Sequence, residues 1–153
     1  MQKTLATLLA FLLSAQALAE DNMGLTLATR GDVRVARDGS ERPLKQGDFI
    51  AVGDRVILAE RSFSVIQLYD GAKLSLRPDT TITVVEFNVD GAAGGNALLE
   101  LEKGGIKLIA GSITTSNPGG FRIRTPLSEL TVKEHEASVA LCEDIVCEKG
   151  GVE

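Results

Sequence analysis

Two cysteines near the end of the chain are the residues whose type and spacing most directly allow chemistry. Cys142 and Cys147 enclose four residues, and an even number of cysteines in an exported protein favours a disulfide. A hairpin turn through the enclosed residues would bring their β-carbons within bonding range. The alternatives are a metal site that also uses His135 and Glu136, and a pair of free thiols. Because structural zinc prefers a more regular ligand set, we predict a disulfide between Cys142 and Cys147 and no metal site.

Acidic residues lie beside several turn glycines, where calcium could be considered. Asp48, Asp54 and Asp70 each adjoin a glycine. A calcium-binding loop, however, alternates acidic residues and ends in a distal Glu, and this pattern is not present. We therefore expect these three carboxylates to cap turns.

A pair of nearby carboxylates, Glu100 and Glu102, could suggest an enzyme that acts on polysaccharides. Residues two apart on a strand share one face, so both would point outward beside solvent. The single histidine, His135, lies between two glutamates, which is typical of a charged surface residue. Without a recognisable nucleophile and its partners, we expect no enzymatic activity, no catalytic residues and no cofactor.

Composition excludes several classes of protein. The chain has 153 residues with 44% hydrophobic and 24% charged residues, which is enough apolar surface for one folded domain rather than a disordered chain. Its net charge of −5 is the wrong sign for a nucleic-acid-binding domain.

The first nineteen residues have the pattern of a secretory signal peptide. Lys3 supplies the positive end, Leu5–Leu13 is an apolar run, and Ala17 and Ala19 form a small-x-small cleavage site. The run is too short for a retained membrane span. We predict cleavage between Ala19 and Glu20, a periplasmic or secreted product in an oxidising compartment, and no membrane-spanning segment.

The rest of the chain alternates between apolar and polar residues with a period of two, as strands do. Asp-Gly and Gly-Gly pairs separate these segments and are typical of tight turns. The predicted strands are Asp32–Arg37, Phe63–Tyr69, Lys73–Arg77, Thr80–Phe87, Leu99–Glu102, Ile106–Ile109, Phe121–Thr125, Leu130–Lys133 and Ser138–Cys142. These features predict an all-β fold of short antiparallel strands, either a rolled sandwich or a β-solenoid-like arrangement, almost free of helix after the signal helix.

Read in order, the strand and turn motifs resemble those of the FecR domain family. The matching motifs are Gly31–Val35 (GDVRV), Leu44–Asp48 (LKQGD), Val52–Val56 (VGDRV), Ile66–Gly71 (IQLYDG), Leu74–Leu76 (LSL), Leu99–Gly104 (LELEKG) and Phe121–Pro126 (FRIRTP). Together, the signal-peptide pattern and the resemblance divide the chain into a signal peptide over residues 1–19, a lead-in over residues 20–30 and a FecR-like all-β domain over residues 31–153.

The resemblance departs from the family pattern at one strand. Where the family has V-R-G-T-x-F-x-V, this chain has Val132–Val139 (VKEHEASV). Glu134 replaces a glycine that permits an unusual backbone angle, and Ala137 replaces a phenylalanine that fills core volume. We expect altered backbone geometry or packing there. At the end of the chain, Lys149–Glu153 resembles a turn into one more strand; if that strand is missing, a sheet edge is open to a partner or a second copy.

The proteins after which the family is named resemble membrane-spanning regulators of extracytoplasmic-function sigma factors. Those regulators have a cytoplasmic segment and one membrane helix. This sequence shows neither, so we do not expect direct binding of a sigma factor. The leading hypothesis is a non-catalytic periplasmic or secreted module that binds an unidentified periplasmic protein or cell-envelope ligand, as a monomer or a weak strand-edge dimer. The alternative is a periplasmic component that modulates such a sigma-factor system.

Overall fold

Strands account for nearly all of the regular structure, as the two-residue alternation predicts. The computed structural model describes residues 21–91, 94–142 and 145–148. The predicted signal peptide, with its cleavage between Ala19 and Glu20, lies outside the described residues and stays a prediction. One short helix, α1 (Ser112–Ser116), is present in the described part of the chain, which agrees with the expectation of a fold almost free of helix. No helix in the described part of the chain is long and apolar enough to cross a membrane.

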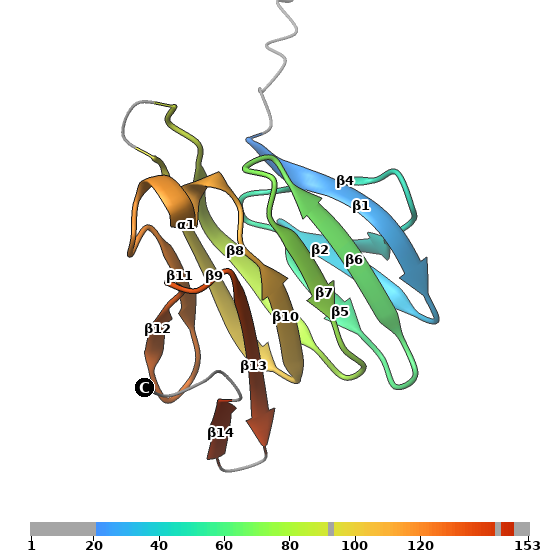
Figure 1. Cartoon of the computed structure of the whole chain (residues 1–153). Helices are drawn as coiled ribbons and strands as arrows, with labels where there is room; N and C mark the ends of the chain where they lie inside the picture. The colour runs from blue at the N-terminus through green and yellow to red at the C-terminus, as the bar shows by residue number, and fades with distance from the viewer. Residues whose placement is uncertain (1–20, 92–93, 143–144, 149–153) are drawn as a thin grey trace, which may run out of the picture.

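Fourteen described strands form two seven-stranded sheets, so the expectation of an all-β fold is confirmed and the arrangement is a sandwich (Figure 1). Sheet A contains, in spatial order, β14 (Ile145–Glu148), β13 (Glu136–Cys142), β10 (Gly105–Ile109), β7 (Lys73–Leu76), β6 (Phe63–Leu68), β1 (Asn22–Arg30) and β4 (Phe49–Ala51). Sheet B contains, in spatial order, β12 (Glu129–Thr131), β11 (Phe121–Arg124), β9 (Asn96–Lys103), β8 (Thr81–Asn88), β5 (Arg55–Leu58), β2 (Val33–Arg37) and β3 (Ser40–Pro43).

The chain passes repeatedly from one sheet to the other rather than completing one sheet first. After β1 in sheet A come β2 and β3 in sheet B, then β4 in sheet A and β5 in sheet B, and the exchange continues to the last described strand. Neighbouring strands are antiparallel, except that β9 and β11 are parallel. Residues 20–30, assigned from the sequence to a lead-in, contain β1, which pairs with both β4 and β6.

Glycines occupy positions where the backbone leaves no room for a side chain. Gly104, at the passage from β9 to β10, has φ of +82°, and a β-carbon there would lie 2.5 Å from the Asp79 carbonyl oxygen. At Gly24, where the register of β1 shifts, a β-carbon would lie 2.3 Å from the Gln67 carbonyl oxygen. The hairpin at Asp38-Gly39 has positive φ at both residues, as a two-residue turn with the twist of its strands requires.

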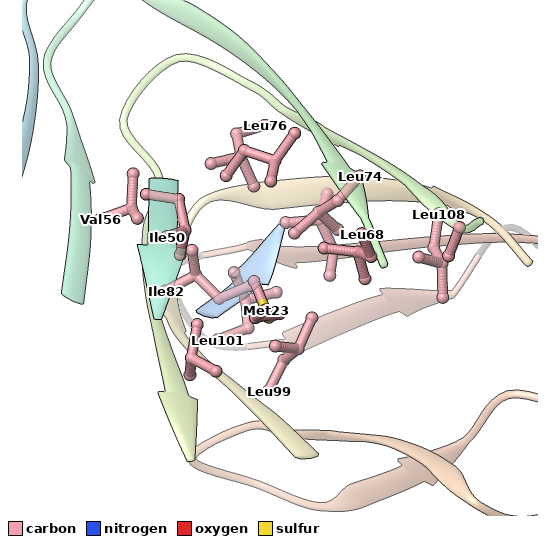
Figure 2. Packing of buried hydrophobic residues seen from close by; sticks show 14 of the residues in the cluster. Met23, Ile50, Val56, Leu68, Leu74, Leu76, Ile82, Leu99, Leu101 and Leu108 are labelled. Atoms are coloured by element: carbon pink, nitrogen blue, oxygen red, sulfur yellow. The ribbon is translucent and has the colours of Figure 1, made fainter. Parts of the chain in front are cut away.

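The core lies between the two sheets and is built from aliphatic side chains (Figure 2). Sheet A contributes residues such as Ile50, Leu68 and Leu76, and sheet B contributes residues such as Val56 and Leu99, all no more than 2% exposed. Among aromatic side chains only Phe121 is buried in the described part of the core. The low aromatic content of the sequence therefore corresponds to a core of Val, Ile and Leu.

Candidate functional site

A cleft of about 570 Å³ opens at the edge of the sandwich where β3 ends sheet B and β4 ends sheet A. We call it the edge cleft. It is lined by Val35, Arg37, Ser40, Arg42, Gly47, Asp48, Phe49 and Asp54.

The register of the β2–β3 hairpin explains which side chains face the edge cleft. Val35 is a core residue on the inner face of sheet B, opposite Arg42, and two residues further on Arg37 lies opposite Ser40. All four therefore share the inner face. Because β4 is short and is the last strand of sheet A, this part of the inner face is left open instead of being covered by core.

An ion pair joins the two sheets at the base of the edge cleft. The Asp54 carboxylate is fully buried and accepts two hydrogen bonds from Arg37, at 2.6 Å from Nε and 2.9 Å from Nη2. Its Oδ2 also accepts a 2.9 Å hydrogen bond from the backbone amide of Ala51, on the edge strand β4. The carboxylate therefore gives the Ala51 amide, on the edge of sheet A, a hydrogen-bond acceptor. Without it, this amide would be free to donate to a strand of another molecule.

A second ion pair crosses the mouth of the edge cleft. Arg42 Nη1 lies 2.7 Å from Asp48 Oδ2, which also accepts a hydrogen bond from the Lys45 amide at 3.0 Å. The Lys45 amide and then the Arg42 guanidinium hold the pKa of Asp48 below its ordinary value. Arg42 is about half exposed, so this pair is far more solvated than the one at the base.

The expectation that the acidic residues beside turn glycines cap turns is confirmed. Asp48 and Asp54 accept backbone amide hydrogen bonds as described above, and Asp70 accepts one from Ala72 at 2.9 Å. Asp70 is 5% exposed, and its Oδ2 has no hydrogen-bond partner within the described structure. Burial raises the pKa of Asp70.

The outer face of sheet A carries exposed and half-buried apolar side chains over β4, β1 and β6. We call this the apolar face and define it by Leu25, Leu27, Phe49, Phe63, Val65 and Tyr69. Phe49, Phe63 and Tyr69 are 51%, 41% and 53% exposed, and they are three of the five aromatic residues in the described chain. Phe49 belongs to both features, since it lines the edge cleft and pairs with Leu25. Aromatic residues are enriched in protein interfaces, and exposed apolar patches mark interaction sites.

The outer face of sheet B is different, because Arg–carboxylate pairs cover it. Glu102 accepts two hydrogen bonds from Arg55, at 2.8 and 2.7 Å, and a third from the Thr83 hydroxyl. Arg122 and Arg124 both pair with Glu129 further along the sheet. Glu102 is therefore held in an ion pair, and the Arg55 guanidinium lowers its pKa.

Glu100 and Glu102 do share the outward face predicted for them. Glu100 lies on β9 between Thr83 of β8 and Arg124 of β11. Both side chains are half-buried in the flat surface of sheet B, and neither lines the edge cleft. This arrangement does not enclose a sugar between two carboxylates as a glycosidase requires.

The alternative metal site does not come together. His135 and Glu136 lie at the start of β13 and Cys142 at its end, about 20 Å away at the rise of a strand. The backbone of Cys147 pairs with Ala140, which is four residues along β13 from Glu136. No group of metal-binding side chains occurs among the residues that were placed. His135 is exposed, as expected.

The cysteine side chains lie outside the described residues, so the disulfide stays a prediction. In the backbone register, Cys142 pairs with Ile145 and Cys147 with Ala140. The cysteines are therefore diagonal neighbours across the β13–β14 hairpin rather than directly opposite, a wider spacing than that of a directly paired position.

The departure from the family pattern affects packing more than backbone geometry. Glu134 does not have a positive φ, so this strand entry needs no glycine. Ala137 is partly buried and lines a cavity of about 90 Å³, together with core residues such as Ile123 and Val139. The structure thus retains space beside Ala137 that a larger side chain would fill. The described chain also adds β14 as the edge of sheet A beyond β13. The further strand into which Lys149–Glu153 would turn lies outside the described residues and stays a prediction.

The sequence analysis missed Arg37, Arg42 and Phe49, because no motif marks them. The hairpin at Asp38-Gly39 nevertheless indicates where Arg37 and Arg42 lie. If Val35 faces the core, alternation places Arg37 on the same face, and the two-residue turn then places Arg42 opposite Val35.

Comparison with known proteins relates the chain to one family. The model of the FecR protein family matches residues 54–153, which is well over half of the chain. No curated protein matches the chain, and no solved structure does. The match begins at Asp54, the buried carboxylate at the base of the edge cleft, and includes β5 to β14. The chain therefore belongs to the FecR protein family.

Proposed function

We propose that this chain is a non-catalytic periplasmic or secreted interaction module, and that a partner protein docks on its apolar face. The observation that carries the proposal is the contrast between the two outer surfaces. Three exposed aromatic side chains, Phe49, Phe63 and Tyr69, lie on sheet A, whereas ion pairs cover sheet B. Aromatic anchors supply most of the binding energy in many interfaces.

The charges around the apolar face indicate what its partner is like. Arg30 pairs with Phe63, and Lys73 lies on β7 beyond Gln67; both are exposed. Neither forms an ion pair with another residue that the structure describes. In a chain with a net charge of −5, such a local cationic rim stands out. It favours a partner whose docking surface has an apolar centre and acidic residues around it.

The state of the carboxylates supports recognition rather than catalysis. Asp54 is bound by Arg37, Asp48 by Arg42, and Glu102 by Arg55. A general acid or base must be free to exchange its proton with a substrate. Carboxylates held in hydrogen-bonded ion pairs instead position the surfaces around them.

Family membership suggests a role in sigma-factor regulatory signalling and an envelope location. Our second candidate function is therefore a component that modulates an extracytoplasmic-function sigma-factor system from the periplasmic side. In that case the partner on the apolar face would be the periplasmic part of a regulator or receptor.

A quantitative capture experiment tests the docking surface. The mature chain would be immobilised and exposed to periplasmic extract, and bound proteins would be measured by mass spectrometry for three forms. These are the wild type, Phe63→Ser with Tyr69→Ser on the apolar face, and Val85→Ser as a control. Val85 is also exposed, at 39%, but lies on β8 of sheet B.

We expect at least one partner to be lost from the double variant by about tenfold or more, as removal of aromatic anchors predicts, and to be retained by the control. Proteins retained equally by all three forms would show that the apolar face is not the docking surface. Substituting Glu for Arg30 and Lys73 should slow association most strongly at low salt.

A further inference from the structure

We propose that the edge cleft is a binding site for a neutral saccharide, a different ligand from the protein that docks on the neighbouring apolar face, with which the cleft shares Phe49. The cleft volume of about 570 Å³ is in the range of sites for small ligands. Its lining combines two guanidinium groups, two carboxylates, a hydroxyl and an exposed phenylalanine.

The charge of the edge cleft selects a neutral ligand. Two guanidiniums, from Arg37 and Arg42, are balanced by two carboxylates, from Asp54 and Asp48. An anionic group entering the mouth meets the Asp48 carboxylate beside Arg42, and a cationic group meets the guanidiniums. Neither sign of charge is therefore favoured, whereas an uncharged polar ligand is not repelled by any of the four groups.

The groups at the mouth can bond to hydroxyls, which both donate and accept hydrogen bonds. Arg42 uses Nη1 for Asp48 and for the Pro43 carbonyl, and its side chain is 52% exposed. Its other N–H groups remain available as donors. Asp48 is 31% exposed and uses Oδ2 in both hydrogen bonds given above, so Oδ1 remains available as an acceptor. The exposed Ser40 hydroxyl can serve in either role.

Phe49 supplies the apolar component that a sugar ring needs. Phe49 is 51% exposed on β4 and lines the edge cleft on the side opposite the β2–β3 hairpin. The face of an aromatic ring carries negative charge density, which attracts the weakly positive C–H groups on the flat side of a sugar. An aromatic ring beside fixed donors and acceptors is therefore a suitable arrangement for a saccharide.

The strands that flank the edge cleft are poorly suited to a peptide that binds as an added strand. On β4, the Ala51 amide is already bonded to the Asp54 carboxylate. On the β3 side, the backbone amide of Leu44 donates a hydrogen bond to the Val33 carbonyl oxygen of β2. Backbone groups alternate in direction along a strand, so those of residue 43 point away from β2, toward the open edge. That position is Pro43, which has no N–H to donate. Strand addition needs free edge groups of this kind, so the edge cleft favours a ligand recognised through side chains.

Calorimetric titration of the mature chain with defined trisaccharides tests this inference. The probes are two neutral trimers, of glucose and of N-acetylglucosamine, and two charged trimers, of galacturonic acid and of glucosamine. The variants are Phe49→Ala and Arg42→Ala, and the matched control is Phe63→Ala, an exposed phenylalanine on the same sheet but outside the cleft.

We expect at least one neutral trimer to bind at millimolar concentration or below and to bind more tightly than the charged trimers. Phe49→Ala should weaken binding by about tenfold, the upper range of an aromatic stacking contribution, whereas Phe63→Ala should leave it unchanged. Absence of binding by both neutral trimers, tighter binding of a charged trimer, or equal binding by Phe49→Ala would each overturn the inference. Thermal melting of each variant checks that it is folded. Because Phe63 is part of the docking test and Arg42 is not, the two proposals can fail independently.

Discussion

Replacing Asp54 with Asn would test how much the buried ion pair at the edge cleft contributes to stability. The Asp54 side chain is 0% exposed and Arg37 is 30% exposed, and the carboxylate links Arg37 of sheet B to the Ala51 amide of sheet A. The substitution preserves the shape of the side chain but turns one acceptor oxygen into an NH₂ group. That group must then face a second donor, either the Arg37 guanidinium or the Ala51 amide.

The expected cost follows from these contacts. Loss of a charged hydrogen bond costs about 1.5–3 kcal/mol, and a buried donor left without a partner costs about 1–3 kcal/mol. Because the Arg37 guanidinium is partly exposed, water recovers some of this loss. We therefore expect Asp54→Asn to lower the free energy of unfolding by roughly 2–4 kcal/mol.

Urea unfolding of the mature chain would measure this change, with Glu102→Gln as the matched control. The Arg55–Glu102 pair has the same two-hydrogen-bond geometry, at 2.8 and 2.7 Å, but its side chains are 46% and 34% exposed. Exposed ion pairs contribute about 0.2–1 kcal/mol. The unfolding midpoint of Asp54→Asn should fall by roughly 1–2 M urea at a typical denaturant slope, and that of Glu102→Gln by much less.

Equal losses for the two variants would refute the reasoning, because they would show that burial does not separate the two ion pairs. A loss below about 1 kcal/mol for Asp54→Asn would also refute it, since the edge amide and the guanidinium would then have found other partners.

Three further predictions concern other sites. Because burial raises the pKa of Asp70, the folded state holds its proton more tightly than the unfolded state, and the contribution of this carboxyl to stability falls as the pH rises above about 4. Unfolding of Asp70→Asn across pH should therefore show a stability that increases relative to wild type from about pH 4 to 7, and a constant difference would contradict this. Ala137→Val should raise thermal stability by about 0.5–1 kcal/mol by filling the 90 Å³ cavity, whereas Ala97→Val, at a fully packed position, should lower it by about 1–3 kcal/mol. Thiol labelling of the oxidised protein should modify neither Cys142 nor Cys147 until a reductant is added, and modification of both without reductant would exclude the disulfide.

The fold class was predictable because strand alternation and turn chemistry are local properties. The segment around Asp70-Gly71 shows this, since an apolar alternation on each side predicts the β6–β7 hairpin that the structure contains. β1 was not recognised as a strand, because its Met-Gly-Leu-Thr-Leu segment includes a glycine and a register shift. The short strands β3 and β4 were missed for a related reason, since three or four residues give too little alternation to recognise.

The candidate sites were less predictable because they depend on which strands end each sheet. The turn-capping role of Asp54 followed from its position beside Gly53, but its ion pair with Arg37 joins residues seventeen positions apart, from the β4–β5 connection and from β2. Phe49 gives no signal as an isolated aromatic residue on a short strand. Its importance arises because β4 ends sheet A, which places Phe49 at the rim of the edge cleft as well as on the apolar face.

The sequence by itself determined that this chain is an acidic all-β protein of the FecR family, with turns capped by carboxylates beside glycines. Those properties depend on composition, on alternation with a period of two and on contacts between residues close in the chain. Only the tertiary structure decided that Glu102 is paired with Arg55 and that exposed aromatic residues collect on one face. These outcomes depend on the order of strands within each sheet, which places residues distant in sequence side by side and which local patterns do not encode.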